Sequence, residues 1–159
     1  MTKFEIISKK QFTQDFVNYT NILHQDLKKP KRATLGSAGY DFFSPVNFSL
    51  APGETIKIPT GIRVLLPFNK FLMIVPRSGL GFKYKLQLDN TVGIIDSDYS
   101  GSDNEGHIWI KMTNDSRDGK TLTVKVGEAI AQGIILKYEL TDDDVTEGVR
   151  NGGFGSTTK

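Results

Sequence analysis

The 159-residue sequence contains no cysteine and only two histidines, His24 and His107. Without cysteine the chain has no disulfide, no thiolate nucleophile and no cysteine-based zinc site. Two histidines cannot form a metal site unaided. A chain without cysteine suits a reducing compartment, and we therefore expect a cytoplasmic protein.

Long apolar runs and an excess of one charge are also missing. No stretch approaches the roughly 20 apolar residues of a membrane span, and the start (MTKFEIISKK) has no apolar signal-peptide block. A net charge of +2 is too small to indicate a nucleic-acid surface. The basic run at 28–32 and the acidic run at 142–144 are typical of solvated surface. We expect neither membrane insertion nor direct nucleic-acid binding.

Residues 1–36 differ in pattern from the rest and predict an N-terminal strand followed by a helical extension. Residues 3–7 (KFEII) favour the strand. Ser8 and Gln11 have the spacing of a capping box. Five apolar residues then recur at spacings of three or four, which predicts an amphipathic helix over residues 9–27; they are Phe12, Phe16, Tyr19, Leu23 and Leu27. We expect this apolar stripe to serve packing or subunit contact.

From residue 36 onward, short apolar runs are separated by turns that contain proline or glycine. This pattern predicts an all-β barrel or sandwich rather than βαβ units. The runs are FSL, TIKIP, GIRVLL, KFLMIV, HIWIKMT, TLTVKV and AIAQGIIL. No linker or repeat divides the chain, so we predict one domain over residues 1–159, which is long enough to bury about 70% of its unfolded surface.

The stretch 88–101 (LDNTVGIIDSDYSG) carries the strongest chemical signal. Residues 88–91 and 92–95 predict the two arms of a small hairpin, with Ile94 and Ile95 anchored in a core. Asp96 would then stand at a strand end on rigid scaffold, where a carboxylate can be aimed at a substrate. For an isolated DSD sequence, the alternative is a turn in which the two aspartates cap their own backbone.

Residues 76–81 (PRSGLG) follow an apolar strand that Pro76 ends. Arg77 offers a planar fork for phosphate oxygens, Ser78 adds a hydroxyl, and Gly79 lets backbone amides approach an anion at the expected start of a short helix. Taken alone, this sequence is more often an ordinary surface turn, because short motifs have high false-positive rates.

The last ten residues (RNGGFGSTTK) are too rich in glycine, serine and threonine to order themselves by burial. An ordinary frayed terminus is one interpretation. Phe154 between glycines favours another, because an aromatic ring can stack on a base for roughly 1–3 kcal/mol. Arg150, Ser156 and Thr157 could contact phosphates beside it. We therefore expect a flexible tail over residues 150–159 that closes over a substrate.

Five segments, in order, resemble the five signature motifs of the trimeric dUTPases. They are SAGYD at 37–41, PRSGLG at 76–81, the 88–101 stretch, GEAIAQG at 127–133 and RNGGFGST at 150–157. The lengthened turn that follows the central motif (SDNEGHI) resembles the Gram-positive and phage branch of this family. Since it is charged and polar, we expect a solvated loop. The resemblance implies a distorted jelly-roll, in agreement with the all-β pattern.

The resemblance implies Mg²⁺-dependent hydrolysis of dUTP to dUMP and diphosphate, with Asp96 as general base. It implies a homotrimer with active sites shared between subunits, and it places Asp41 near Mg²⁺ through a water. The implied phosphate contacts are Arg77, Ser78, Gly79, Gln132, Arg150, Ser156 and Thr157. The implied uracil and deoxyribose contacts are Asn90, Gly93, Ile95, Asp96, Tyr99 and Phe154.

Two alternatives stay open. A dCTP deaminase shares the fold and the triphosphate contacts, but it needs a glutamate on the strand after the central loop, where HIWIKMTN carries Lys111 and no carboxylate. A nucleotide-sensing or partner-binding protein could use residues 1–30 and 102–106 as its interaction surface. Intact Asp96, Arg77 and Gln132 argue against a loss of catalysis.

Overall fold

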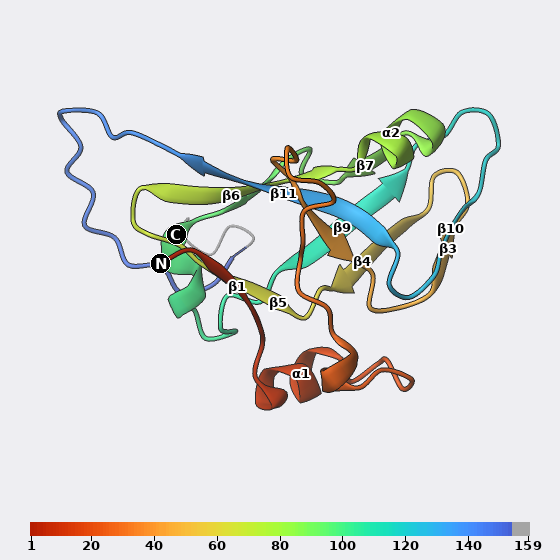
Figure 1. Ribbon diagram of the computed structural model, residues 1–159, viewed down its shortest axis with the longest axis horizontal. Coiled ribbons are helices and arrows are strands. Elements are labelled where there is room, and N and C mark those ends of the chain that lie inside the picture. The colour runs from red at the N-terminus through yellow and green to blue at the C-terminus, as the bar shows by residue number, and fades with distance from the viewer. Residues whose placement is uncertain (154–159) are drawn as a thin grey trace.

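The computed structural model describes residues 1–153 and consists mainly of short β-strands (Figure 1). This confirms the predicted all-β class. The strands are β1 (Lys3–Ile6), β2 (Tyr40–Phe43), β3 (Phe48–Leu50), β4 (Thr55–Pro59), β5 (Ile62–Leu65), β6 (Lys70–Pro76), β7 (Leu86–Leu88), β8 (Gly93–Ile95), β9 (Trp109–Asn114), β10 (Leu122–Val124) and β11 (Ala129–Lys137). The helices are α1 (Lys9–Asp15) and α2 (Ser78–Tyr84), with the 3₁₀ turns η1 (His24–Asp26) and η2 (Ser97–Gly101).

The strands form antiparallel pairs between segments that are mostly far apart in the sequence. A four-stranded sheet has the order β2-β11-β6-β8, and a three-stranded sheet has the order β4-β9-β7. The pairs β1-β5 and β3-β10 complete the framework. Figure 1 shows β6 and β11 running side by side across the molecule.

One main core lies between these sheets, because alternate side chains of each strand turn inward. In β9, Ile110 and Met112 are buried while Lys111 between them is exposed. Phe42, Ile58 and Leu72 from three other strands are fully buried in the same cluster. Across residues 1–153, no helix combines the length and the apolar character needed to cross a membrane.

The N-terminal extension confirms the predicted strand, but the prediction of one helix over residues 9–27 is wrong. Helix α1 ends at Asp15, and the chain then turns and forms η1. The β-branched residues Val17, Thr20 and Ile22 have low helix propensity and weaken any continuation. Most of the apolar stripe still packs, although Leu23 is 59% exposed. Phe16, Leu27 and Ile7 form a second buried cluster, with further contacts from Ile6, Phe12, Tyr19 and Ile22.

Ser8 caps helix α1, although the predicted reciprocal capping box is wrong. The Ser8 hydroxyl accepts a hydrogen bond from the Gln11 amide at 3.1 Å, as expected. The Gln11 side chain instead donates to Asp15 at 2.7 Å. The Ser8 backbone N–H donates to Glu105 at 2.9 Å. The acceptor that Gln11 would supply in a capping box therefore comes from a residue 97 positions away.

Residues 102–106, here called the insert loop, are largely buried or half-buried, so the prediction of a solvated loop is wrong. Ser102 and Gly106 are buried, and within the loop only Glu105 and Gly106 have positive φ angles, +60° and +71°. The contacts of Glu105 with Ser8 and with Arg63, 4.0 Å away, attach the loop to the N-terminal extension and to β5. Local polarity did not reveal these contacts because their partners are distant in sequence.

The 88–95 segment also differs from the predicted hairpin. Its two arms do not pair with each other: β7 pairs with β9, whereas β8 pairs with β6. The turn between them runs through Thr91 with φ +66°. Neighbouring residues of a strand face opposite sides, so Ile95 packs against the core while Ile94 is 52% exposed.

His107 follows the insert loop and is fully buried. Its Nε2 accepts a hydrogen bond from the Gly61 backbone N–H at 2.8 Å. The proton therefore sits on Nδ1, which donates to the Asp15 carboxylate. Burial lowers the pKa of His107 below its ordinary value of 6.5, against the opposing effects of Asp15 and Glu105.

We expect the free energy of unfolding to fall as the pH drops below about 6.5, because the unfolded chain then binds a proton that folded His107 does not bind. The loss continues down to the lowered pKa of the folded chain, with a slope of at most about 1.4 kcal/mol per pH unit. His107→Gln keeps an acceptor for Gly61 and a donor for Asp15 without titrating, so it should flatten this dependence. Urea unfolding between about pH 5 and 8 tests this, with His24→Gln as the control that should retain the slope. An unaltered slope in His107→Gln would contradict the assignment.

Candidate functional site

The predicted site residues form two separate clusters in the structure. The first cluster lies where β6 ends at Pro76. Arg77 points its Nε at the Asp41 carboxylate, 3.1 Å away, and Asp41 in β2 is paired with Gln132 in β11. The Gln132 amide donates to the Pro76 carbonyl at 3.4 Å. Three neighbouring strands, β2, β11 and β6, thus bring an arginine, a carboxylate and an amide together at one end of the sheet.

The residues after Arg77 form the short helix that the sequence predicts. Helix α2 begins directly after Arg77, which confirms the expected short helix. Ser78 and Gly79 lie at its first turn. In the SAGYD segment, a Cβ atom on Gly39 would lie 2.4 Å from the Gln132 side-chain oxygen. Glycine at this position therefore leaves the room that the Gln132 side chain occupies.

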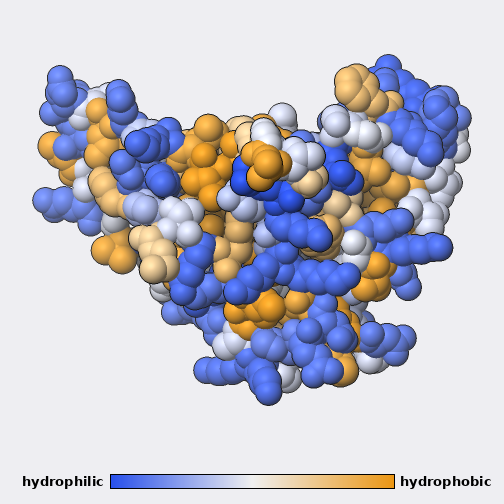
Figure 2. Space-filling view, viewed as in Figure 1, coloured by the Kyte–Doolittle hydropathy of each residue, from blue (hydrophilic) through white to orange (hydrophobic). Residues whose placement is uncertain are grey.

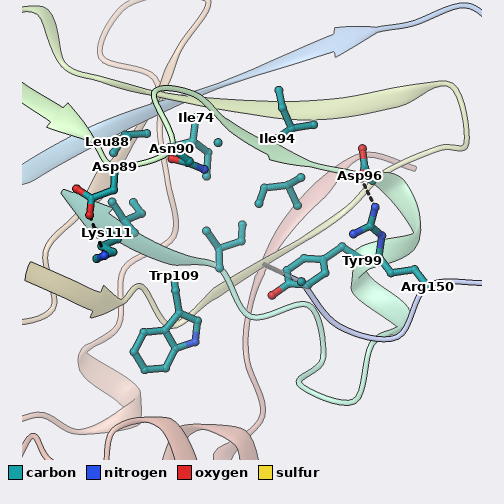
Figure 3. Close-up of a pocket in the computed structure, with 15 residues that line it drawn as sticks. Ile74, Leu88, Asp89, Asn90, Ile94, Asp96, Tyr99, Trp109, Lys111 and Arg150 are labelled. Carbon is teal, nitrogen blue, oxygen red and sulfur yellow. Dashed lines mark hydrogen bonds and ion pairs between the residues drawn. The ribbon is translucent and has the colours of Figure 1, made fainter. Parts of the chain in front are cut away.

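The second cluster surrounds a cavity of about 300 Å³ (Figure 3). The turn between β7 and β8 forms one wall and β9 forms another. Ile74, Leu88 and Ile110 make its lining largely apolar, as is usual for a small-molecule site. The predicted uracil and sugar residues of the described chain all line this one cavity; they are Asn90, Gly93, Ile95, Asp96 and Tyr99.

Asp96 follows β8 at the rim of the cavity, and its side chain is 44% exposed. The Arg150 guanidinium pairs with Asp96 (Figure 3). It also pairs with Asp98, at 2.9 Å. Arg150, which the sequence predicts to contact phosphate, is thus ion-paired with two aspartates of its own chain. Phe154, Ser156 and Thr157 lie outside the described residues.

The residues that continue from Arg150 are anchored rather than free. The Asn151 amide donates to the Asp103 carboxylate at 2.9 Å, and its oxygen accepts from the Asp103 backbone N–H at 3.1 Å. The Gly152 N–H donates to the Ser102 hydroxyl at 3.0 Å. The insert loop therefore holds the beginning of the predicted tail beside Asp96.

Sequence reasoning missed several residues that line the cavity, among them Asp89, Trp109 and Lys111. Lys111 forms an ion pair with Asp89 at 3.0 Å (Figure 3). The Thr113 hydroxyl, and after it Lys111, lowers the pKa of the Asp89 carboxyl. A lysine between the apolar residues Ile110 and Met112, opposite an acidic turn, was the available signal for this wall.

Asp96 and Arg77 lie near opposite ends of β6. Asp96 comes directly after Ile95, which pairs with Leu72 near the start of β6. Arg77 comes directly after the last residue of the same strand. At about 3.3 Å per residue, this separates Arg77 from Asp96 by roughly 15–20 Å. A single copy of the chain does not bring both side chains to one point.

The family model described as dUTPase matches residues 25–158. The chain belongs to the dUTPase family. A deoxyuridine 5'-triphosphate nucleotidohydrolase of Lactococcus lactis subsp. lactis (strain IL1403) is 39% identical over 131 residues, which cover 80% of this chain and 86% of that relative. The corresponding enzyme of Hahella chejuensis (strain KCTC 2396) is 40% identical over 145 residues, with coverage of 85% and 90%. The predicted family membership is confirmed.

Solved dUTPase structures share the fold of this chain. The crystal structure of the dUTPase from Streptococcus mutans has a TM-score of 0.67 and 32% identity, and the match covers 87% of this chain and 98% of that one. A mutant dUTPase from phage phi11 of S. aureus also reaches a TM-score of 0.67, at 20% identity, with coverage of 93% of this chain and 97% of that one. The second likeness shows the shared fold alone. Together they confirm the predicted dUTPase-like architecture.

Proposed function

We propose that this chain hydrolyses dUTP to dUMP and diphosphate. The observation that carries the proposal is the gathering of Asp96, Asn90 and Tyr99 around one apolar cavity, in a chain of the dUTPase family. The cavity is of a size suited to a nucleoside base and sugar, and a half-exposed carboxylate stands at its rim. This arrangement supports a nucleotide reaction in which the base moiety is buried and the phosphates extend outward.

Asp96 acts as the general base in this proposal. Its position at the end of β8 fixes the carboxylate, while its exposure leaves room for a water molecule beside it. The carboxylate polarises this water for in-line attack on the α-phosphorus. Arg150 contacts the same carboxylate. When the triphosphate binds, Arg150 either breaks its ion pair with Asp96 or keeps it while also contacting phosphate.

The cavity selects the base and the sugar. Backbone groups of the turn at Asn90 read the uracil edge, with Gly93 and Ile95 as walls. The Tyr99 ring packs against the deoxyribose and excludes a 2′-hydroxyl by contact. Because a site built from hydrogen-bonding groups rejects a reversed donor and acceptor pattern strongly, discrimination against dCTP rests on the polar groups that it would leave unpaired.

The Arg77 cluster and the tail bind the triphosphate. Arg77 provides the planar fork, and Ser78, Gly79 and Gln132 add hydroxyl, amide and side-chain donors. From the tail, Arg150, Ser156 and Thr157 contact phosphate oxygens and Phe154 stacks on uracil.

Mg²⁺ fits the donor set beside Arg77. Within residues 1–153, no three His, Cys, Asp or Glu side chains gather as a group that could hold a metal ion. A single carboxylate, Asp41, matches an ion that keeps most of its water shell and binds chiefly to substrate phosphates. We assign Asp41 an indirect role through water. When bound, Mg²⁺ would neutralise charge on the triphosphate oxygens.

The separation of Arg77 from Asp96 supports active sites that are shared between copies of the chain, as in the proposed homotrimer. Since Arg77 and Asp96 of one chain are too far apart to act on one phosphate group, a second copy has to supply one of them. Figure 2 shows hydrophobic areas between the polar side chains of one face. Large apolar side chains that stay exposed on a single copy, such as Leu35, Phe68 and Phe82, provide surface for such contacts.

A substrate panel tests the function directly. The protein is incubated with dUTP, dTTP, dCTP and UTP in the presence of Mg²⁺, and diphosphate and ammonia are both assayed. We expect diphosphate from dUTP and little from the other three nucleotides. Ammonia from dCTP would instead indicate the deaminase, although β9 carries Lys111 and no carboxylate. Binding of dUTP without turnover would indicate a nucleotide sensor.

A further inference from the structure

The hydroxyl group of Tyr99 is held by the insert loop and the residue after it rather than by the catalytic turn. Tyr99 lies on η2, directly after the turn at Asp96, and its side chain is buried although the ring borders the cavity. Its hydroxyl donates to the His107 carbonyl at 3.0 Å and accepts from the Asn104 side-chain amide at 2.9 Å. Residues 104 and 107 therefore satisfy this hydroxyl as both donor and acceptor.

Asn104 is itself fixed in the orientation that this contact requires. Its side-chain oxygen accepts from the Gly106 backbone N–H at 3.1 Å. Because that oxygen faces a donor, the amide nitrogen is the atom directed at the Tyr99 hydroxyl. The Asn104 carbonyl also accepts from the His107 N–H at 3.0 Å, which closes the turn.

The loop packs directly on the backbone that carries Tyr99. A Cβ atom on Gly106 would lie 2.7 Å from both the Ser100 Cα atom and the Tyr99 carbonyl oxygen. Glycine at positive φ is therefore needed for this approach. On the other side, the Glu105 carboxylate binds the Ser8 backbone N–H. The insert loop thus contacts η2 on one side and the N-terminal extension on the other, and these contacts hold Asn104 in place.

We propose that Asn104 is a positioning residue that sets the preference for deoxyribose over ribose by fixing the Tyr99 ring. The proposal rests on the function proposed above, in which this ring excludes a 2′-hydroxyl. Exclusion by contact works only if the ring cannot tilt, because a shift of about 1 Å or less already changes whether one extra oxygen fits. Asn104 supplies the side-chain hydrogen bond that opposes this tilt.

The test uses Asn104→Ser, with the ratio of kcat/KM for dUTP to that for UTP as the readout. A serine hydroxyl can still accept from the N–H two residues onward, so the turn to Gly106 is kept while the donor to Tyr99 is lost. We expect the ratio to fall about threefold to tenfold, as for the loss of one buried hydrogen bond. Most of the change should come from improved use of UTP. Asn104→Ala, which loses both contacts, should lower the ratio at least as much.

A double-mutant cycle with Tyr99→Phe separates positioning from a general effect on the loop. If Asn104 acts through the hydroxyl, Asn104→Ser should not lower the ratio further once Tyr99→Phe is present. Asn18→Ser is the matched control, because it makes the same substitution at an exposed asparagine of the N-terminal extension that does not line the cavity. Its ratio should equal that of the unmodified chain.

Two results would overturn the proposal: an unchanged ratio in Asn104→Ser, or an equal fall with and without Tyr99→Phe. Tyr99→Ala distinguishes this failure from failure of the proposed site. A lowered ratio in Tyr99→Ala with none in Asn104→Ser would refute only the role of Asn104. An unchanged ratio in Tyr99→Ala would refute the contact between this ring and the sugar.

Discussion

Replacing Asp96 by asparagine is expected to lower kcat for dUTP by roughly 10²–10⁴-fold while KM changes little. The amide has nearly the same size as the carboxylate and can still accept a hydrogen bond from Arg150. It cannot take a proton from water, so the loss falls on the chemical step. Because the side chain lies at the rim and is 44% exposed, the substitution should not disturb the core.

Asp98→Asn is the matched control for this experiment. Asp98 lies two residues away and also binds Arg150, at 2.9 Å, but it is not among the residues that line the cavity. We expect Asp98→Asn to keep kcat within a few-fold of the unmodified chain. Steady-state kinetics of both variants measure the difference. Full turnover by Asp96→Asn would refute the base assignment, and equal losses in both variants would point to the anchoring of Arg150 instead.

The strands could be predicted because the alternation of apolar and polar residues within each strand reflects which of its faces is buried. In β9, the alternation of Ile110, Lys111 and Met112 states which side faces the core. The prediction that Ile94 and Ile95 are both anchored in a core is wrong, since two successive strand residues cannot both point inward. The helix over 9–27 failed for a related reason: Phe16 and Leu27 are buried as expected, but helical spacing also fits a chain that turns back on its own cluster.

The cavity residues Asn90, Gly93, Ile95, Asp96 and Tyr99 could be predicted because they lie within one short segment, residues 88–101, whereas the wall formed by residues 108–111 could not. The contacts that hold the cavity residues could not be predicted either, because they join distant parts of the chain. Glu105 binds Ser8 across 97 positions, and Arg150 binds Asp96 across 54. No local pattern of charge or hydropathy encodes such pairs. The prediction of a solvated insert loop is wrong for this reason, because the loop contacts Tyr99, the N-terminal extension and the tail.

Deleting residues 151–159 is expected to depress turnover of dUTP by about 10²-fold or more, since it removes the proposed stacking ring Phe154 and the phosphate partners Ser156 and Thr157. The thermal stability of the proposed trimer should change little. Asn151 is exposed, and its described partner Asp103 is exposed as well. The cut after Arg150 leaves the ion pairs of that residue with Asp96 and Asp98 in place.

A shorter deletion, of residues 154–159, divides the effect between the two parts of the tail. It keeps Asn151 and Gly152, which bind the insert loop. If the ring and the hydroxyls orient the triphosphate, both deletions should lose activity to a similar extent. If the anchor on the insert loop matters in addition, the longer deletion should be the more damaging one. Phe154→Ala in the full chain isolates the contribution of stacking.

Kinetics and sedimentation of the same samples decide whether the tail takes part in catalysis. Closure of a segment over the substrate excludes water and completes the site, so its loss should lower kcat without dissociating the subunits. A product complex with dUMP should be affected less, because dUMP lacks the β- and γ-phosphates that Ser156 and Thr157 are proposed to hold. Full activity in a truncated, intact oligomer would show that residues 151–159 are an ordinary terminus and that their likeness to the fifth motif has no catalytic meaning.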